Sequence, residues 1–426
     1  MIDGPTYRLS ENLARQCLPN WHLAQVHRVD FDNDYFAKNP LSNRELAPIF
    51  DTFHEHRFDF YMREWGGLGA DDLEAVVDAL CDSVLLQRRV WPDRQPRLPV
   101  SSVMAAFSAY KKLLGWAPEV KTVLEVGPGT GLISLFMKRL PALERYSQVE
   151  ACQGLYLLQG MANDLAFPYE VEEKALPQNL ATAADFHLVE NPLLELPCYV
   201  DMPRRPPRCV HYPWWRVGEL MKQPGSVDVV MSNANLREFS QYALRDYLAL
   251  FRRVLKPDGV VLAQCLGGEL HRDASGLISE LRDMKFAPIV FDLQGGSRWF
   301  SGPNLPLMAK SFCTSNAVLV GPEHPLFEKY NKAECFEGCH FGAEPAVLDM
   351  YFPQDGLRRL YSVAELRDLV EARLVVRLTS ADPVGVRSTK RRPRATDDQP
   401  LFTSSFDPRF GWSAGFSRAP RFCLGG

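Results

Sequence analysis

The stretch that most constrains the fold is an apolar run ending in three alternating glycines, residues 123–131 (VLEVGPGTG), with an apolar pattern directly after it. This order predicts a strand, a tight turn and a helix N-terminus, which together let a ligand approach the backbone closely. A dinucleotide site would favour a further glycine at Leu132, whereas the acidic Glu125 before the turn suits a cationic ligand. A purely structural strand-to-helix turn gives the same pattern, so residues further along the chain must decide.

A second strand, predicted over residues 145–150, ends in the acidic residue Glu150. In a doubly wound sheet, an acid at this position reaches the ribose hydroxyls of a nucleoside bound over the strand ends. Glu150 could equally be a solvated loop acid, and its distance along the chain from the glycine turn favours ribose binding.

Later apolar runs continue the alternation of strands and helices. Strands are predicted over residues 227–231, 260–264, 288–291 and 316–320, and residues 209–215 predict a further strand that runs into an aromatic loop. Helices are predicted over residues 131–140 and 154–166, and another follows Phe239, with its apolar stripe between Tyr242 and Phe251. A turn with the sequence KPDG, residues 256–259, precedes the strand at 260–264. The pattern predicts an α/β fold built on a mainly parallel sheet.

The resemblance to class I S-adenosylmethionine-dependent methyltransferases covers about residues 118–320. It is carried by the glycine turn (Gly127, Gly129 and Gly131), by the acids Glu150 and Asp228, and by the turn at 256–259. The resemblance implies a Rossmann-like, seven-stranded methyltransferase sheet whose last two strands form a reversed hairpin. It also implies S-adenosyl-L-methionine as the cofactor, and the contacts it suggests are Glu125, Gly127, Gly129, Gly131, Glu150, Tyr212, Trp214 and Asn233.

Three shorter stretches, residues 149–156, 211–214 and 232–239, resemble bacterial sugar O-methyltransferases. The chain departs from that family's pattern at the ends of the second and fourth strands, where Ala151, Asn235 and Phe239 stand in place of its usual residues. The resemblance therefore implies a sugar or other small-molecule hydroxyl as acceptor, and the departures bear on the acceptor more than on the cofactor.

An oxygen acceptor needs a group that removes its proton. The candidates for a catalytic base are Glu238, His211 and His54. Glu238 could instead cap its own helix, and the histidine at 54 could have a packing or surface role. Tyr212 and Trp214 could stack on an adenine, or they could belong to the core.

No set of residues has the spacing of a metal site, and we predict no metal. The residues between Cys335 and His340 lack a second pair of ligands at the spacing of structural zinc sites.

The 426 residues predict three parts: a helical cap over 1–118, a cofactor domain over 119–320 with an insertion at about 167–206, and an extension over 321–426. The extension includes a basic run, 387–394, expected to be a solvated tail. A net charge of −4 gives no general attraction to nucleic acid. With no membrane-spanning apolar run and no signal sequence, the expected location is cytoplasmic.

Two alternative functions stay open from the sequence. A methyltransferase acting on a nitrogen or carbon atom, or on a protein, would share the cofactor signature. A methyltransferase-like module that binds a ligand without turnover would do so too. The oligomeric state cannot be inferred from these residues.

Overall fold

The structure is a computed structural model of the chain. It describes residues 2–17, 40–52, 58–175, 206–233, 235–236, 239–264, 274–292, 316–337, 339–347, 358–380 and 403–404.

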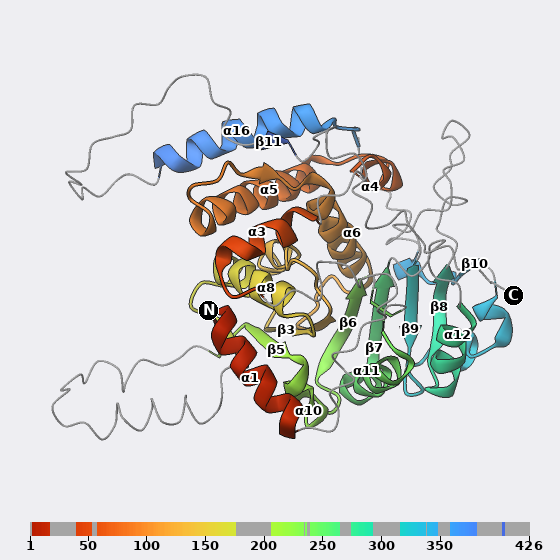
Figure 1. The fold of residues 1–426 in the computed structure, drawn as a ribbon. Coiled ribbons are helices and arrows are strands. Elements are labelled where there is room, and N and C mark those ends of the chain that lie inside the picture. The colour runs from red at the N-terminus through yellow and green to blue at the C-terminus, as the bar shows by residue number, and fades with distance from the viewer. Residues whose placement is uncertain are drawn as a thin grey trace, which may run out of the picture.

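A single large sheet forms the centre of the molecule, with the strand order β10-β8-β9-β7-β6-β2-β3-β5-β4 (Figure 1). The strands β5, β3, β2, β6 and β7 run parallel, whereas β9 is antiparallel to both of its neighbours, β7 and β8. The seven predicted strands are β2 (Thr122–Val126), β3 (Arg145–Glu150), β5 (Cys209–Pro213), β6 (Val227–Asn233), β7 (Leu255–Gln264), β8 (Ala287–Asp292) and β9 (Asn316–Val320).

The predicted seven-stranded sheet lacks two short edge strands that the structure contains. The strand β4 (Val171–Glu173) pairs with β5 in parallel, and β10 (Cys339–Phe341) pairs with β8 in antiparallel fashion. The first comes from the predicted insertion and the second from the C-terminal extension. Each covers what would otherwise be an open edge with unpaired backbone groups.

Two layers of helices cover the sheet because its strands are apolar on both faces. Val123, Met231 and Leu262 belong to a core shared with α5 (Ala70–Val90), α6 (Val100–Trp116) and α8 (Gln153–Ala166). Their chain neighbours Leu124, Val230 and Val261 belong to a second core, shared with α10 (Val217–Met221), α11 (Gln241–Val254) and α12 (Ala274–Asp283). This alternation is the signature of a sheet buried on both sides.

The N-terminal segment adds three more helices, α1 (Gly4–Cys17), α3 (Asn43–Thr52) and α4 (Phe58–Glu64). The helices α1 and α3 pack on α8, and α4 packs on α6. The helix α1 contributes to both cores, with Tyr7 in the first and Ala14 in the second. Helical cap and sheet therefore share one continuous core within the described residues. The remaining short elements are α7 (Ser134–Met137), α14 (Phe327–Tyr330), the 3₁₀ helices η3 (Trp214–Arg216) and η5 (Ala333–Phe336), and the two-residue pair β1 (Arg97–Leu98) with β11 (Thr403–Ser404).

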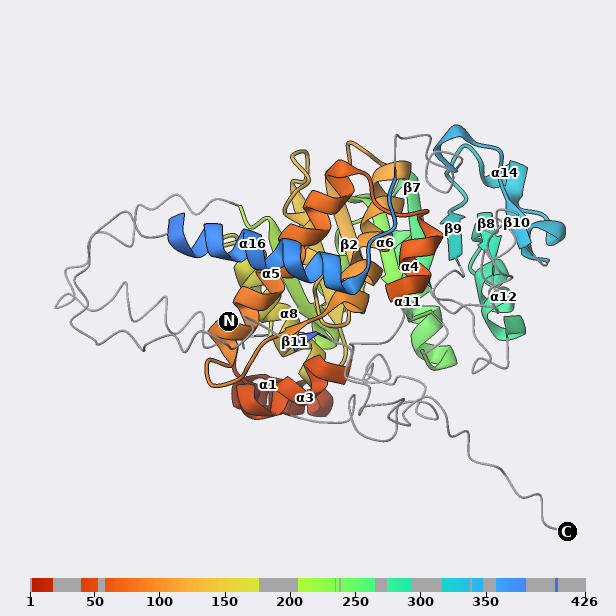
Figure 2. The same cartoon turned by 90° about the horizontal axis from the view of Figure 1, so that it is seen from above.

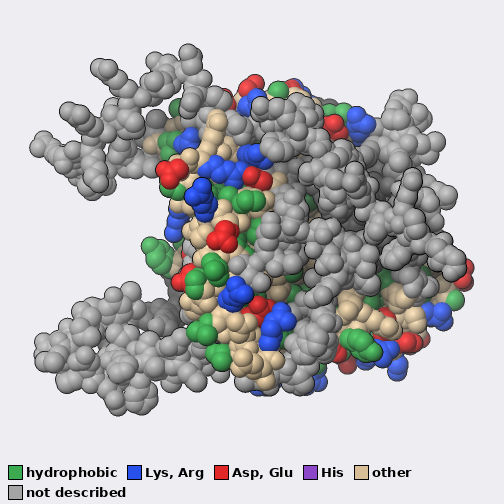
Figure 3. All heavy atoms as spheres, in the orientation of Figure 1, with side chains coloured by type: hydrophobic (Ala, Val, Ile, Leu, Met, Phe, Trp, Pro, Cys, Tyr) green, Lys and Arg blue, Asp and Glu red, His purple; other side chains and the backbone are tan. Residues whose placement is uncertain are grey.

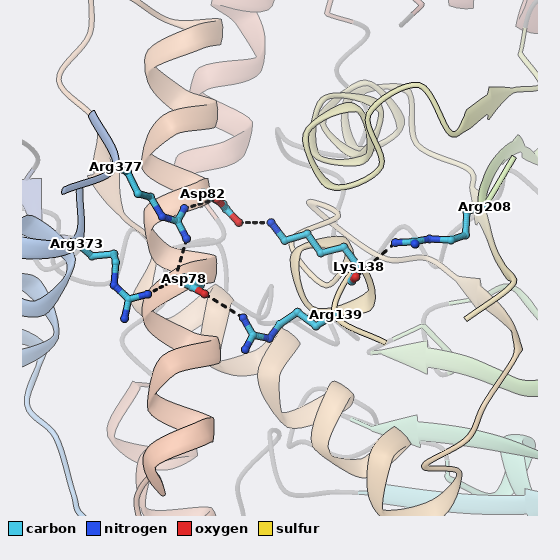
Figure 4. Close-up of polar contacts among 7 residues, drawn as sticks. All are labelled: Asp78, Asp82, Lys138, Arg139, Arg208, Arg373 and Arg377. Atoms are coloured by element: carbon cyan, nitrogen blue, oxygen red, sulfur yellow. Dashed lines mark hydrogen bonds and ion pairs between the residues drawn. The ribbon is translucent and has the colours of Figure 1, made fainter. Parts of the chain in front are cut away.

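The C-terminal extension returns to the N-terminal helices through α16 (Val363–Ser380), which lies along α5 (Figures 1 and 2). Ion pairs fix this contact. Asp78 and Asp82 on α5 bind Arg373 and Arg377 of α16 on one side and Lys138 and Arg139 on the other (Figure 4). The extension is thus tied to the segment that follows the glycine turn.

Two local predictions differ from the structure. The helix expected over 131–140 is regular only at Ser134–Met137, because the amides of its flanking residues bond carbonyls mostly three residues back, as in a 3₁₀ helix. The turn expected at residues 256–259 lies inside β7, where the pairing with β6 is irregular between Val227 and Val229. No described helix is long and apolar enough to cross a membrane.

Candidate functional site

The glycine turn lies at the carboxyl edge of the sheet, directly after β2. Gly127, Gly129 and Gly131 have φ values of 67°, 60° and 76°, a region that favours glycine. The amide of Gly127 donates to the carbonyl of Val149 at 2.9 Å. This bond places the turn beside Glu150, so the two predicted binding positions adjoin.

The middle glycine differs from its two neighbours in its surroundings. A Cβ atom at Gly127 would collide with the side chain of Asn235, and one at Gly131 would lie 2.8 Å from the Cα of Gln159. At Gly129 a Cβ would meet nothing within 4 Å among the described residues. The outer glycines are therefore needed for packing, whereas Gly129 borders open space where a ligand could lie.

Glu150 is only 4% exposed and accepts three hydrogen bonds. One carboxylate oxygen accepts from the amides of Ala151 and Cys152, at 2.8 and 2.9 Å, and the other accepts from the side chain of Gln159 at 2.7 Å. Burial raises the pKa of Glu150 to about 7, although these bonds oppose the shift. The carboxylate thus already orders the loop that follows β3.

Gln159, on α8, joins the two predicted positions directly. Its amide nitrogen donates to the carbonyl of Gly129 and to Glu150, both at 2.7 Å, and its oxygen lies 3.0 Å from the Nε2 atom of His211. Sequence reasoning missed Gln159, because nothing in its helical surroundings sets it apart from an ordinary polar residue.

Glu125 is buried beneath the same turn, with 2% of its surface exposed. Burial raises its pKa to about 8, the hydrogen bond from the Tyr146 hydroxyl lowers it, and the nearby Glu150 raises it further. The Tyr146 hydroxyl also accepts from Gln148 at 2.7 Å. Glu125 is therefore the end of a buried polar network, and its burial favours the protonated form.

The aromatic residues predicted to hold an adenine are packed inside the protein. Tyr212 is 1% exposed, and its hydroxyl accepts from Arg145 at 3.0 Å. Trp214 is fully buried under α1, where its ring nitrogen donates to Glu11 at 3.0 Å and the Arg15 guanidinium lies over the ring. These contacts favour the core interpretation that the sequence left open.

The helix α1 also covers the loop that follows β3. The amide nitrogen of Gln153 donates to the carbonyls of Gly4 and Pro40, at 3.2 and 2.9 Å. Tyr7 is fully buried, and its ring lies 4.8 Å from that of Tyr156. Burial first, and then nearby carboxylates that include Glu150, raise the pKa of Tyr7 well above its usual value. The N-terminal segment therefore covers the region beside Glu150.

Of the three candidate bases, only His211 lies within the described residues. Its ring is fully buried, is stacked on Tyr156 with ring centres 3.7 Å apart, and lies 3.4 Å from a carboxylate oxygen of Glu173. This placement gives His211 a structural role in the network around Gln159. Glu238 and His54 lie outside the described residues.

Two asparagines lie at the carboxyl end of β6: Asn233 is its last residue, and Asn235 follows it. The side chain of Asn235 donates to the carbonyls of Val126 and Gly127, both at 2.9 Å, and so fixes the start of the glycine turn. Asn233, the predicted cofactor contact, is half-buried, and its side-chain oxygen has no hydrogen-bond partner within the described structure. Its neighbour Ser232 is 2% exposed and has an equally unpartnered hydroxyl.

At the opposite, amino edge of the sheet, Asp228 is a structural residue. It accepts from the amides of Lys121 and Thr122, at 3.0 and 2.8 Å, and from the Lys256 ammonium. Burial alone would raise the pKa of Asp228, but the bonds from Lys256 and Thr122 lower it overall. Asp228 thus joins β2, β6 and the KPDG turn, away from the candidate site.

Across the described parts of the chain, no group of three or more histidine, cysteine or acidic residues could hold a metal ion. The cysteines at 81, 152, 209 and 335 are buried and unbridged. Figure 3 shows one face of the molecule, in the orientation of Figure 1, and basic and acidic side chains are interspersed over the described part of this face.

No protein-family profile matches the sequence, and no curated protein matches it. Among solved structures, the chain is similar to phosphoethanolamine N-methyltransferase 1 of Haemonchus contortus in complex with phosphoethanolamine and S-adenosylhomocysteine, with 12% identity and a TM-score of 0.29 over 71% of this chain and 55% of that one. It is also similar to the spermidine synthase of Thermotoga maritima, with 13% identity and a TM-score of 0.28 over 62% and 75% of the two chains.

Similarity to the [4+2]-cyclase SpnF covers 47% of this chain and 63% of that one, with 18% identity and a TM-score of 0.26. The match to PKMT2 of Rickettsia typhi covers 24% of that protein. The chain thus spans less than two thirds of the length of both SpnF and PKMT2. At such low TM-scores, the assignment of the fold rests on strand order and register.

Those two features define the fold class. The sheet is doubly wound around β2, which lies between β3 and β6, and the reversed strand β9 lies between β7 and β8. This is the Rossmann-like, class I methyltransferase-like fold that the sequence predicted, with helices on both faces and two added edge strands.

Proposed function

We propose that the chain binds S-adenosyl-L-methionine at the carboxyl edge of its sheet and transfers the methyl group to an oxygen of a small molecule or sugar. One observation carries the proposal: the open, left-handed Gly129 is joined through Gln159 to Glu150. An open turn and a buried acid side by side at the strand ends are what a nucleoside ligand requires in a doubly wound sheet.

The residues fit the two ends of such a cofactor in different ways. At the glycine turn, the Cβ position of Gly129 faces open space, which leaves its backbone accessible to a ligand. At Glu150, ribose hydroxyls would replace the side-chain amide of Gln159 as hydrogen-bond donors. The N-terminal segment that begins with α1 covers this position and would have to admit the nucleoside. Glu125 would lose its proton to hold a cationic group. When bound, the cofactor would supply an electrophilic methyl group.

The decisive experiment is a calorimetric titration with S-adenosylhomocysteine. We expect saturable binding that Gly129→Val abolishes, because the side chain fills the ligand space. Gly225→Val is the matched control, since Gly225 also has a positive φ, 59°, and open space around its Cβ position, but it precedes β6 at the amino edge. Equal affinity in both variants would show that the glycine turn is not part of the binding site.

A second candidate is a binding module without turnover, favoured by the internal hydrogen bonds that occupy both Glu150 oxygens. Incubation with methyl-labelled cofactor and a panel of metabolites and glycans, read by mass spectrometry, separates the two candidates. Binding without transfer to any acceptor would support the second.

A further inference from the structure

Below the glycine turn, Glu125 is held by a group of polar side chains on one face of the sheet. Glu125 and Gln148 are opposite each other in the β2–β3 ladder, and Tyr146 lies two residues before Gln148, on the same face. All three residues are buried, with at most 2% of their surface exposed. Polar groups at this depth need hydrogen-bond partners, so their donors and acceptors determine what each group can still bind.

The hydrogen bonds of this group run in one direction, toward Glu125. The Asn163 side chain donates to the oxygen of Gln148 at 2.6 Å and accepts from the Ser134 hydroxyl at 2.6 Å. The amide nitrogen of Gln148 donates to the hydroxyls of Ser134 and Tyr146, at 3.2 and 2.7 Å. Because the Tyr146 hydroxyl accepts one of these bonds, its single hydrogen is left for Glu125, to which it donates.

This network occupies one oxygen of Glu125 and leaves the other available. The Tyr146 hydroxyl contacts the Oε2 atom, and within the described structure no hydrogen bond reaches Oε1. Glu125 also lines a small cavity at the carboxyl edge of the sheet, together with Ser232 and Asn233. The bond from Tyr146 therefore fixes the carboxyl group at the border of a cavity that belongs to the predicted cofactor position.

The polar atoms beside Glu125 in this lining suit a hydrogen-bond donor. The hydroxyl of Ser232 and the side-chain oxygen of Asn233 have no hydrogen-bond partner among the described residues, and Ser232 is 2% exposed. Amide and carboxylate oxygens only accept hydrogen bonds, and a hydroxyl can accept them. A buried acceptor without a partner carries a desolvation cost that a bound donor removes. A primary ammonium group, with three hydrogens, matches three such acceptors.

The charges near Glu125 act on its ionisation in opposite directions. Burial raises the pKa of Glu125 to about 8, the hydrogen bond from Tyr146 opposes this shift, and the nearby Glu150 adds to it. Lys112 of α6 lines the same cavity, and its ammonium donates to side chains of β7 and β9. The bond from Tyr146 is thus a contact that favours the carboxylate, the form that binds a cation.

We propose that Tyr146 is a positioning residue for the ammonium group at the amino-acid end of the cofactor: it holds Glu125 so that the free oxygen of this carboxylate accepts from the ammonium, together with Ser232 and Asn233. This inference rests on the proposed function. It adds Tyr146 and Ser232 to the residues predicted from the sequence. Neither lies in the glycine turn, and Tyr146 acts through a carboxyl group on the adjacent strand.

The test compares two ligands that differ at this end. S-adenosylhomocysteine carries the ammonium group, whereas 5′-methylthioadenosine retains the nucleoside and the sulfur but lacks the amino-acid end. In calorimetry of the full-length chain at neutral pH, Tyr146→Phe should weaken S-adenosylhomocysteine binding roughly tenfold, because a hydrogen bond to a charged group is lost. It should leave 5′-methylthioadenosine binding unchanged. Ser232→Ala should show the same selectivity with a smaller loss.

Tyr330→Phe is the matched control. It also removes a tyrosine hydroxyl that donates to a glutamate, Glu344, but this pair belongs to the C-terminal extension. It should bind both ligands as the unaltered chain does.

Unchanged S-adenosylhomocysteine binding in Tyr146→Phe would overturn the inference. An equal loss for both ligands would overturn it too, since Tyr146 would then have a general structural role. If Tyr146→Phe does not fold, Gln148→Met replaces it, because it removes the bond that directs the Tyr146 hydrogen to Glu125; unchanged binding there decides against the inference.

The two proposals fail in different ways. If S-adenosylhomocysteine does not bind to the unaltered chain, the proposed function is refuted, and this inference with it. If it binds to the unaltered chain and to Tyr146→Phe with equal affinity, only the role of Tyr146 is refuted.

Discussion

At the scale of single residues, Glu150 shows how one carboxylate can serve structure and binding together. It was predicted to accept ribose hydroxyls, and in the structure it accepts two loop amides and the side chain of Gln159. The hydrogen bonds from the two loop amides occupy one carboxylate oxygen, and the other oxygen can exchange Gln159 for another donor. The same residue therefore shapes the loop and remains available to a ligand that displaces Gln159.

Replacing Glu150 should separate these two roles. Glu150→Ala should weaken S-adenosylhomocysteine binding by about 1–3 kcal/mol. It should also lower the melting temperature, because it leaves three hydrogen-bond donors without an acceptor. Glu150→Gln retains an oxygen for the loop amides, so it should keep more of the stability and still lose affinity. Calorimetry and thermal unfolding measure the two effects. Full affinity in Glu150→Gln would argue against ribose binding.

At the scale of elements, the packing of α16 on α5 joins the C-terminal extension to the cofactor domain. Two aspartates of α5 contact four basic groups, and Arg377 bridges both aspartates at 2.7 and 2.8 Å (Figure 4). The Asp82 side chain is 8% exposed, so its two charge partners lie in a poorly solvated contact. Buried Val370 and Leu374 of α16 complete the packing.

Asp82→Ala should therefore destabilise the chain by about 2 kcal/mol, since it leaves Lys138 and Arg377 without a shared carboxylate. The loss should be measurable as a lower midpoint in urea unfolding. Glu144→Ala is the control, because its pair with Lys121 is exposed on both sides, 59% and 63%. A similar loss in both variants would show that burial does not strengthen the α5–α16 ion pairs.

At the scale of the whole molecule, the carboxyl edge of the sheet concentrates buried ionisable groups. Glu125 and Glu150 both have raised pKa values, about 8 and about 7, and burial is the largest cause in each case. Each binds its proton more tightly in the folded chain than in the unfolded chain. Their contribution to stability is therefore present at low pH and is lost as the pH rises.

The free energy of unfolding should accordingly fall between pH 5 and pH 8 through these two groups, by roughly a few kcal/mol in total. Chemical unfolding measured across that range tests this. Glu125→Gln should flatten the curve from about pH 5 up to about pH 8, and Glu150→Gln from about pH 5 only up to about pH 7, because each group contributes a slope between its unfolded and its folded pKa. An unchanged slope in Glu125→Gln would show that this carboxyl group is ionised in the folded chain at lower pH.

The sequence alone determined the strand-turn-helix order, the positions of the seven central strands and the pairing of an acid with a glycine turn. These features are local: each depends on the apolar period of a short segment or on the positive φ of a glycine such as Gly129. The strand predicted at residues 316–320 coincides with β9 for the same reason, since a continuous apolar run suits a strand buried on both faces.

Only the tertiary structure decided which polar residues meet at the carboxyl edge. Gln159 reaches Gly129 and Glu150 from α8, and Lys112 reaches Gln264 and Asn316 from α6. Each contact joins segments that are distant in sequence, so no periodicity encodes it. Likewise, the edge strands β4 and β10 are too short to have an apolar period, and they become strands because the sheet offers them unpaired backbone groups.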